Sequence, residues 1–113
     1  DVFDGFDWIP LSDAQTYAMI AKGETDGVFQ LEGWSARNGV KELKPTKLGD
    51  VIASMALFRK ATLKSGATAT YIKRRHKLER TPERHELIQK SVKETYGIMV
   101  YQEQVVSILR ESV

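Results

Sequence analysis

The sequence has 113 residues, 42% of them hydrophobic and 28% charged, a composition that suits one small globular unit with a modest core. No apolar run approaches the ~20 residues of a membrane span, so we expect no membrane partner. The absence of cysteine excludes a disulfide framework and a thiolate metal site, and two histidines, His76 and His85, cannot alone build a zinc site. Without a signal peptide pattern, a cytoplasmic location is expected.

The charge is unevenly distributed along the chain. Residues 1–58 hold 5 basic and 9 acidic side chains, residues 59–93 hold 11 and 3, and residues 94–113 hold 1 and 3. The net charge of +2 therefore hides a basic block of net charge +8 at residues 59–93. Such a block suits a phosphate-bearing partner, because cationic side chains displace counterions from nucleic acid. The alternative is a solvated helix face.

The pattern predicts a mainly α fold. Residues 1–11 form an aromatic and acidic lead-in, expected to be extended, and residues 12–113 form one helical domain whose last helix has no stop signal before the chain ends. Ser12 with Gln15 is a capping-box pattern that starts a first helix, and Gly23 suits a left-handed cap at its end.

Further helices are predicted from apolar spacing and from caps. They cover residues 31–43, a most buried helix from Thr46 to Ala56, residues 67–78, a helix from Thr81-Pro82 to Thr95-Tyr96-Gly97, and residues 102–113. Apolar residues assigned to helix core faces include Leu48, Val51, Ile52, Met55, Tyr71, Ile72, Leu78, Val105, Val106, Ile108 and Leu109. Met19, Met55 and Met99 are interpreted as core filler.

Few residue groups suggest catalysis. Paired carboxylates usually hold Mg²⁺ in phosphoryl transfer, but Asp4 and Asp7 are better interpreted as solvent-facing acids. His76 and His85 are interpreted as surface or capping histidines. We therefore assign no catalytic residue and no metal ligand. Tyr and Gln side chains gather after the basic block, where they suit stacking and hydrogen bonding to nucleotides, or equally a packed Tyr96–Tyr101 pair with a capping Gln.

Five motifs in order give a specific resemblance. They are Ile9-Pro10-Leu11-Ser12-Asp13, Gly27-Val28-Phe29-Gln30-Leu31-Glu32, Leu43-Lys44-Pro45, Ile52-Ala53 with Ala56-Leu57-Phe58-Arg59, and Thr95-Tyr96-Gly97-Ile98 with Val100-Tyr101-Gln102-Glu103-Gln104-Val105. Their order resembles the alpha subunit of bacterial DNA polymerase III, the C-family replicative polymerase, from about Asp7 to Val113. The resemblance implies a fragment that starts the fingers, after a palm domain that carries the catalytic aspartates and Mg²⁺.

Arg59 matches the motif arginine of the family, and the leading hypothesis, that the parent protein is a DNA-directed DNA polymerase, gives expected roles to ten residues. Nucleotide contacts are expected at Arg59, Lys60, Lys64, Tyr101, Gln102 and Gln104, and DNA phosphate contacts at Lys73, Arg74, Arg75 and Lys77. The expected partners are primer-template DNA, deoxynucleoside triphosphates, the palm domain and further replication proteins. The fragment alone is expected to bind no cofactor and to be inactive.

The sequence departs from the family pattern at two places. Lys60-Ala61-Thr62 replace the Pro-Gly-Pro that follows the motif arginine, which changes the local backbone around Arg59, and Gly33-Trp34 replace a Ser and a smaller neighbour. A divergent homologue, for example from a phage, would explain these changes. A second hypothesis is a non-catalytic helical module that kept the fingers framework for DNA or protein binding.

Overall fold

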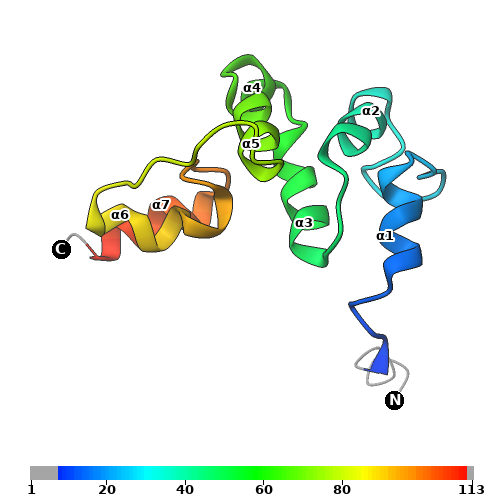
Figure 1. Cartoon of the computed structure of the whole chain (residues 1–113), viewed down its shortest axis with the longest axis horizontal. Coiled ribbons are helices and arrows are strands. Elements are labelled where there is room, and N and C mark those ends of the chain that lie inside the picture. The colour runs from blue at the N-terminus through cyan, green and yellow to red at the C-terminus, as the bar shows by residue number, and fades with distance from the viewer. Residues whose placement is uncertain (1–7, 112–113) are drawn as a thin grey trace. The chain divides into compact units, whose positions relative to one another are not determined.

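The computed structural model describes residues 8–111, and all regular secondary structure within that range is helical (Figure 1). The helices are α1 (Ala14–Ala21), α2 (Trp34–Leu43), α3 (Leu48–Leu57), α4 (Lys60–Lys64), α5 (Ala67–Arg75), α6 (Glu86–Val92), the 3₁₀ helix η2 (Lys93–Thr95) and α7 (Gln102–Glu111). The predicted mainly α class is thus confirmed. Asp4 and Asp7 lie outside the described residues.

The chain forms two compact units, residues 1–55 and 56–113, so that α3 crosses the boundary between them. In the first unit α1 packs against α2, and the core holds Leu31, Val40 and Leu43, all three without exposed surface. Tyr17 and Ile20 of α1 are also buried there. These apolar side chains drive the packing of the two short helices, which would be marginal in isolation.

Gly23 ends α1 as predicted. Its φ is +79°, its N–H donates to Ile20 O at 2.9 Å, and the N–H of Glu24 donates to Met19 O at 3.2 Å. These two bonds form a Schellman cap, which favours glycine because a left-handed backbone strains other residues. Gly23 also lies close to α2, since an added Cβ would stand 2.5 Å from Lys41 Cε.

The starts of the first two helices differ from the prediction. Asp13, not Ser12, precedes α1, and Asp13 Oδ2 accepts a hydrogen bond from Thr16 Oγ1 at 2.5 Å. Leu31 does not begin α2, because its carbonyl accepts the hydroxyl of Thr25 at 2.5 Å inside a turn. Helix α2 therefore begins three residues later, after Gly33.

Helix α3 buries small and polar side chains rather than its largest apolar ones. Its buried residues are Asp50, Ala53, Ser54 and Leu57, more than in any other helix of the described range. Three residues assigned to its apolar face, Leu48, Ile52 and Met55, are exposed, so that assignment was wrong. Thr46 lies just before this helix, and its backbone N–H and hydroxyl both donate to Asp50 Oδ2 in the first turn, at 3.0 and 3.3 Å. The predicted cap at Thr46 stays a prediction.

In the second unit, α4 and α5 form a helical pair, of which only α5 was predicted from the sequence. Helix α4 was not expected, because Arg59 to Ser65 carry few apolar residues. Helix α5 begins as predicted after Gly66, whose φ is +81°, and the buried Thr68 hydroxyl donates to Leu57 O at 2.6 Å. It ends at Arg75 instead of Leu78, and Leu78 is 77% exposed rather than part of an apolar stripe.

Helix α6 begins at Glu86, later than Thr81-Pro82 predicted. His85 provides the N-cap, since its Nδ1 accepts the backbone N–H of Leu87 at 3.1 Å, which confirms the capping interpretation of this histidine. Just before the helix, the Arg84 backbone N–H donates to Gln89 Oε1 of α6 at 2.7 Å. The helical stretch ends at Thr95-Tyr96-Gly97 as predicted, through η2.

Helices α6 and α7 pack on each other, and Ser91 Oγ donates to Ser107 Oγ across their contact at 3.1 Å. The predicted core face of α7 is only partly correct. Ile108 is half-buried, whereas Val105, Val106 and Leu109 are exposed. The core-filler interpretation was also wrong for the methionines of the described range: Met19, Met55 and Met99 are exposed by 37%, 40% and 57%.

We expect Gly23→Ala to lower the free energy of unfolding by about 1–2 kcal/mol, because alanine is strained at a φ of +79° and its Cβ would displace Lys41. Gly49→Ala is the control. Gly49 lies in α3, where the nearest atom to an added Cβ is Lys47 Cε at 3.9 Å, so alanine should raise stability by about 0.5–1 kcal/mol. Urea denaturation of the 113-residue chain measures both, and equal effects would contradict the account.

Candidate nucleotide and DNA interface

All ten predicted site residues lie between residues 59 and 104, in the second unit. Their exposure divides them into three classes. Exposed side chains are Arg59, Lys60, Lys64, Lys73, Lys77 and Gln102, half-buried ones are Arg74, Arg75 and Tyr101, and Gln104 is buried. Only the exposed class is immediately available to a nucleotide or to a DNA phosphate.

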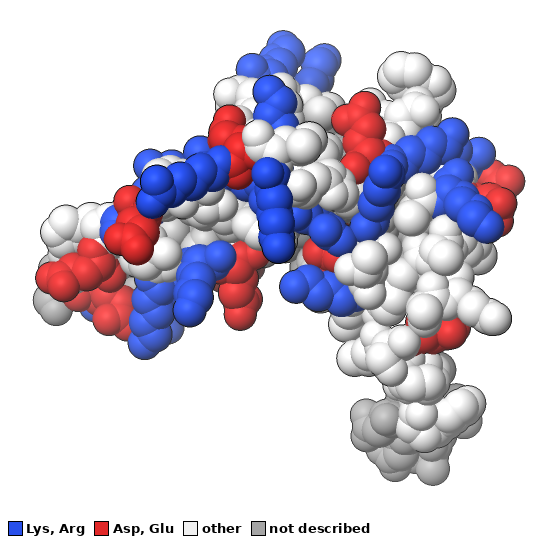
Figure 2. Space-filling view, viewed as in Figure 1, with Lys and Arg blue, Asp and Glu red and all other residues white. Residues whose placement is uncertain are grey.

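The first group surrounds α4. Arg59 is the N-cap residue of this helix, with φ −82° and ψ 147°, and Lys60 is the first helical residue. Figure 2 shows Lys and Arg side chains gathered over α4. Lys60-Ala61-Thr62 thus form the first turn of a helix that begins directly after Arg59. The arginine side chain is exposed at that helix start.

The second group lies at the end of α5. Lys73 is in the last turn of the helix, and Lys77 follows it in a left-handed conformation with φ +60°. A hydrogen bond from the Leu78 N–H to Lys73 O at 2.8 Å closes this helix end. The two lysines are exposed and lie within four residues of each other.

The guanidinium of Arg74 forms its hydrogen bonds inside the unit. Its Nε donates to Glu79 Oε2 at 2.8 Å, its Nη1 donates to Tyr96 O at 2.8 Å, and its side chain is 11% exposed. A phosphate contact by Arg74 would have to replace or share these bonds. DNA binding by Arg74 stays a prediction. In the structure its guanidinium has two partners within the unit, Glu79 and Tyr96 O.

Arg74 reaches a strained turn. Tyr96 has φ +57° and Gly97 has φ +79°, two successive left-handed residues. The Tyr96 ring packs edge-on against Tyr71 of α5, with ring centroids 5.0 Å apart and planes at 83°. Tyr96 therefore pairs with Tyr71, not with Tyr101 as one interpretation had it. Arg84 Nε donates to the next carbonyl, Gly97 O, at 3.1 Å.

Gln104 connects the same turn to the start of α7. Its Oε1 accepts the backbone N–H groups of Val100 and Tyr101 at 2.7 and 2.8 Å. Its Nε2 donates to Ser91 O at 3.0 Å and to Thr95 Oγ1 at 2.7 Å. Both amide protons and both acceptor positions are occupied, which is the full capacity of a glutamine side chain. Gln104 is thus a capping glutamine that holds the backbone of Tyr101.

Sequence reasoning missed Arg84 and Thr95, and it missed helix α4. Thr95 joins Gln104 to the turn, since its hydroxyl also donates to Ile98 O at 2.6 Å. Arg84 looked like one more charge in a basic block. The helix end at Tyr96-Gly97 was visible in the sequence, but no local pattern indicates which side chains donate to its carbonyls.

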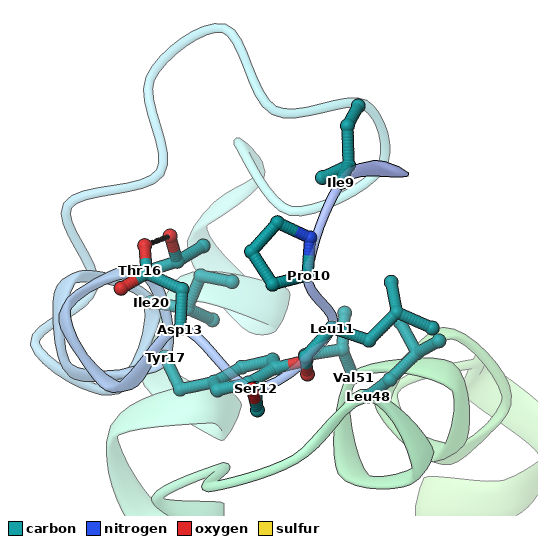
Figure 3. A pocket seen from close by; sticks show the side chains of 10 residues that line it. All are labelled: Ile9, Pro10, Leu11, Ser12, Asp13, Thr16, Tyr17, Ile20, Leu48 and Val51. Carbon is teal, nitrogen blue, oxygen red and sulfur yellow. Dashed lines mark hydrogen bonds between the residues drawn. The ribbon is translucent and has the colours of Figure 1, made fainter. Parts of the chain in front are cut away.

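Both units have apolar hollows, of which one in each is described here. In the second unit a pocket of about 490 Å³ has Arg74 and Arg84 among its lining and an apolar floor of Ile88, Val92 and Ile98. In the first unit a pocket of about 470 Å³ lies between residues 9–13, α1 and the start of α3 (Figure 3). It contains none of the ten predicted residues.

The hollow of the first unit is closed on one side by Tyr17, whose hydroxyl donates to Leu11 O. Leu11 lies beside Leu48 and Val51 in Figure 3. Asp13 is the one charged residue among those that line the hollow, and its carboxylate already accepts a hydrogen bond from Thr16 Oγ1. An apolar hollow of this kind suits packing more than phosphate binding.

Within residues 8–111, no cluster of three or more His, Cys, Asp or Glu could hold a metal ion. In the same range no helix is long and apolar enough to cross a membrane.

The chain matches the family of the bacterial DNA polymerase III alpha subunit finger domain over residues 4–112. It is 43% identical over 100 residues to the DNA polymerase III subunit alpha of Aquifex aeolicus, covering 88% of this chain and 9% of that protein. The subunit alpha of Deinococcus radiodurans is 39% identical over 116 residues, with 96% of this chain and 8% of that protein covered. An error-prone DNA polymerase of Symbiobacterium thermophilum is 37% identical, with 91% and 10% covered.

These matches define the class of protein: an all-helical finger domain of a C-family DNA polymerase. The chain belongs to the bacterial DNA polymerase III alpha subunit finger family. It spans about a tenth or less of the length of these curated relatives. The resemblance drawn from the five sequence motifs is thereby confirmed.

We expect Gln104→Leu to lower the free energy of unfolding by about 3 kcal/mol, because it leaves the backbone N–H groups of Val100 and Tyr101 without their acceptor and removes the donor to Ser91 O and Thr95 Oγ1. Gln102→Leu, at an exposed position of the same helix, should change stability by less than about 0.5 kcal/mol. Chemical denaturation of both variants measures the difference. Equal stability would show that the Gln104 network contributes nothing.

Proposed function

We propose that this chain serves as the finger domain of a DNA-directed DNA polymerase and positions the incoming nucleotide and the primer-template DNA. The observation that carries the proposal is the coincidence of the family match with six exposed predicted contact residues in one unit. The chemical step would belong to carboxylates of the palm domain, where Mg²⁺ would support in-line attack of the primer 3′-hydroxyl on the α-phosphate. The fragment alone would then be inactive.

The nucleotide side of the proposal rests on the start of α4 and of α7. Arg59, Lys60 and Lys64 are exposed cations on or beside one short helix, where they would neutralise the triphosphate. Tyr101 and Gln102 lie at the start of α7, where they would form part of the pocket wall. Gln104 supports that wall through its bonds to the Tyr101 backbone rather than through a contact of its own.

The DNA side rests on the end of α5. Lys73 and Lys77 are exposed and close in sequence, so they suit contacts to successive phosphates that add affinity without reading bases. Arg75 stays in the proposed set although it is half-buried, whereas the half-buried Arg74 guanidinium is already bonded to Glu79 and to Tyr96 O. We therefore assign the larger share of phosphate binding to the lysines.

The double variant Lys73→Ala, Lys77→Ala should weaken DNA binding about equally for all sequences, because phosphate contacts carry no sequence information. The slope of log K against log salt should become shallower by up to ~2 units. Lys22→Ala with Lys47→Ala, two exposed lysines of the acidic first half, is the matched control and should leave the slope unchanged. An unchanged slope for the first pair would remove α5 from the DNA path.

Arg59→Ala in the whole polymerase should raise the KM for deoxynucleoside triphosphates about tenfold or more, since one charge-assisted contact to a phosphate is lost. Arg59→Lys should recover part of the loss, because the charge is kept while the planar fork is not. Arg80→Ala, an exposed arginine outside the proposed site, is the control. A KM equal to that of the wild type would contradict the role of Arg59.

The alternative is a non-catalytic DNA- or protein-binding module. It is favoured by Lys60-Ala61-Thr62, which replace the family Pro-Gly-Pro beside the motif arginine. Primer extension with Mg²⁺ or Mn²⁺ by the whole protein separates the two functions. Extension supports the polymerase, whereas its absence in a folded protein that still binds DNA would favour the module.

A further inference from the structure

Two arginines of the basic block, the half-buried Arg74 and the exposed Arg84, donate to the protein's own backbone. Arg74 and Arg84 come from different segments, α5 and the stretch before α6, and donate to two successive carbonyls, Tyr96 O and Gly97 O. The guanidinium groups therefore converge on one turn. An added Cβ at Gly97 would meet Arg84 Nε at 3.4 Å and Arg74 Nη1 at 3.6 Å, which places both groups directly against it.

The turn needs such donors. Two successive left-handed residues direct their carbonyls away from the helical ladder, and Tyr96 is not glycine, so its φ of +57° costs energy. Helical bonds hold only the amide side: the Gly97 N–H donates to Val92 O at 2.9 Å and the Ile98 N–H to Thr95 O at 3.1 Å. The two arginines hold the carbonyl side.

A continuous chain of hydrogen bonds leads from this turn to α7. Thr95, directly before Tyr96, accepts Gln104 Nε2 at 2.7 Å, and Gln104 Oε1 accepts the Tyr101 N–H at 2.8 Å. A shift of the turn would therefore move the backbone on which Tyr101 and Gln102 stand. Networks of this kind are rigid when every member is satisfied.

We propose that Arg74 and Arg84 are positioning residues that clamp the Tyr96–Gly97 turn and thereby fix Tyr101 and Gln102 for the incoming nucleotide, in place of a role as DNA phosphate contacts. This inference rests on the proposed polymerase function. It separates the two arginines from Lys73 and Lys77, whose exposed ammonium groups bind phosphates.

The test uses the whole polymerase with primer-template DNA and deoxynucleoside triphosphates. Arg84→Ala should raise the KM for the nucleotide about tenfold, speed hydrogen exchange at the amides of Gly97 and Ile98, and leave the salt slope of DNA binding unchanged. Arg84→Lys should recover part of the KM, since an ammonium can still donate to one carbonyl. Arg80→Ala removes a charge from the same stretch and should change none of the three.

Arg74→Lys keeps the charge but loses the planar fork that reaches Glu79 and Tyr96 together. The clamp predicts a raised KM and faster exchange for this variant, whereas a phosphate contact predicts neither. If an alanine variant fails to fold, this conservative substitution still tests the inference.

A salt slope shallower by ~1 for Arg84→Ala, with KM and exchange unchanged, would overturn the inference in favour of a phosphate contact. Faster hydrogen exchange with an unchanged KM would show that the turn does not position Tyr101 and Gln102 for the nucleotide, and it would overturn that part of the inference. If the wild-type protein extends no primer, the proposed function itself fails, and the exchange rates alone decide whether the arginines hold the turn.

Discussion

The second unit depends on how the carbonyl and amide groups of one left-handed turn are satisfied. Residues 95–97 receive hydrogen bonds from three segments: Arg74 of α5, Arg84 before α6 and Gln104 of α7. No apolar contact alone would fix such a turn, because dispersion and burial have no direction. Hydrogen bonds are directional, and here they connect α5, the stretch before α6 and α7, which contain few large buried side chains.

This arrangement changes the meaning of the basic block. A net charge of +8 over residues 59–93 suggested a continuous phosphate-binding surface. In the structure the charge has two uses: exposed lysines remain available to a polyanion, and at least two arginines hold the backbone. Arg suits the second use, since its several donors lie in a fixed plane and stay protonated. A count of charges could not have made this distinction.

Much of the helical pattern could be predicted from the sequence, because apolar spacing and glycine caps are local signals. Gly23 and the end at Tyr96-Gly97 were correct for this reason. The helix starts were less predictable: the side chain of Thr25, six residues before Leu31, binds Leu31 O in the turn that precedes α2. Helix α4 has almost no apolar pattern. The predicted burial of methionine side chains failed, because periodicity indicates a face and not what covers it.

The candidate site was predictable where family motifs carried it and not where tertiary contacts decided it. The motif residues Arg59 and Gln102 are exposed as a binding role requires. Gln104, in the same motif, turned out to be a capping residue with all four hydrogen-bonding positions occupied. The roles of Arg74 and Arg84 depend on the position of Tyr96 and Gly97, 22 and 13 residues further along the chain. No local pattern encodes such a distance.

The most direct measurement is an experimental structure of the whole polymerase bound to primer-template DNA and an incoming nucleotide. Our account predicts Lys73 and Lys77 within ion-pair distance of DNA phosphates, Arg59 at the triphosphate, and Arg74 and Arg84 still bonded to the carbonyls of the 96–97 turn. Arginine side chains released from that turn and placed on phosphates, with the lysines in solvent, would contradict it.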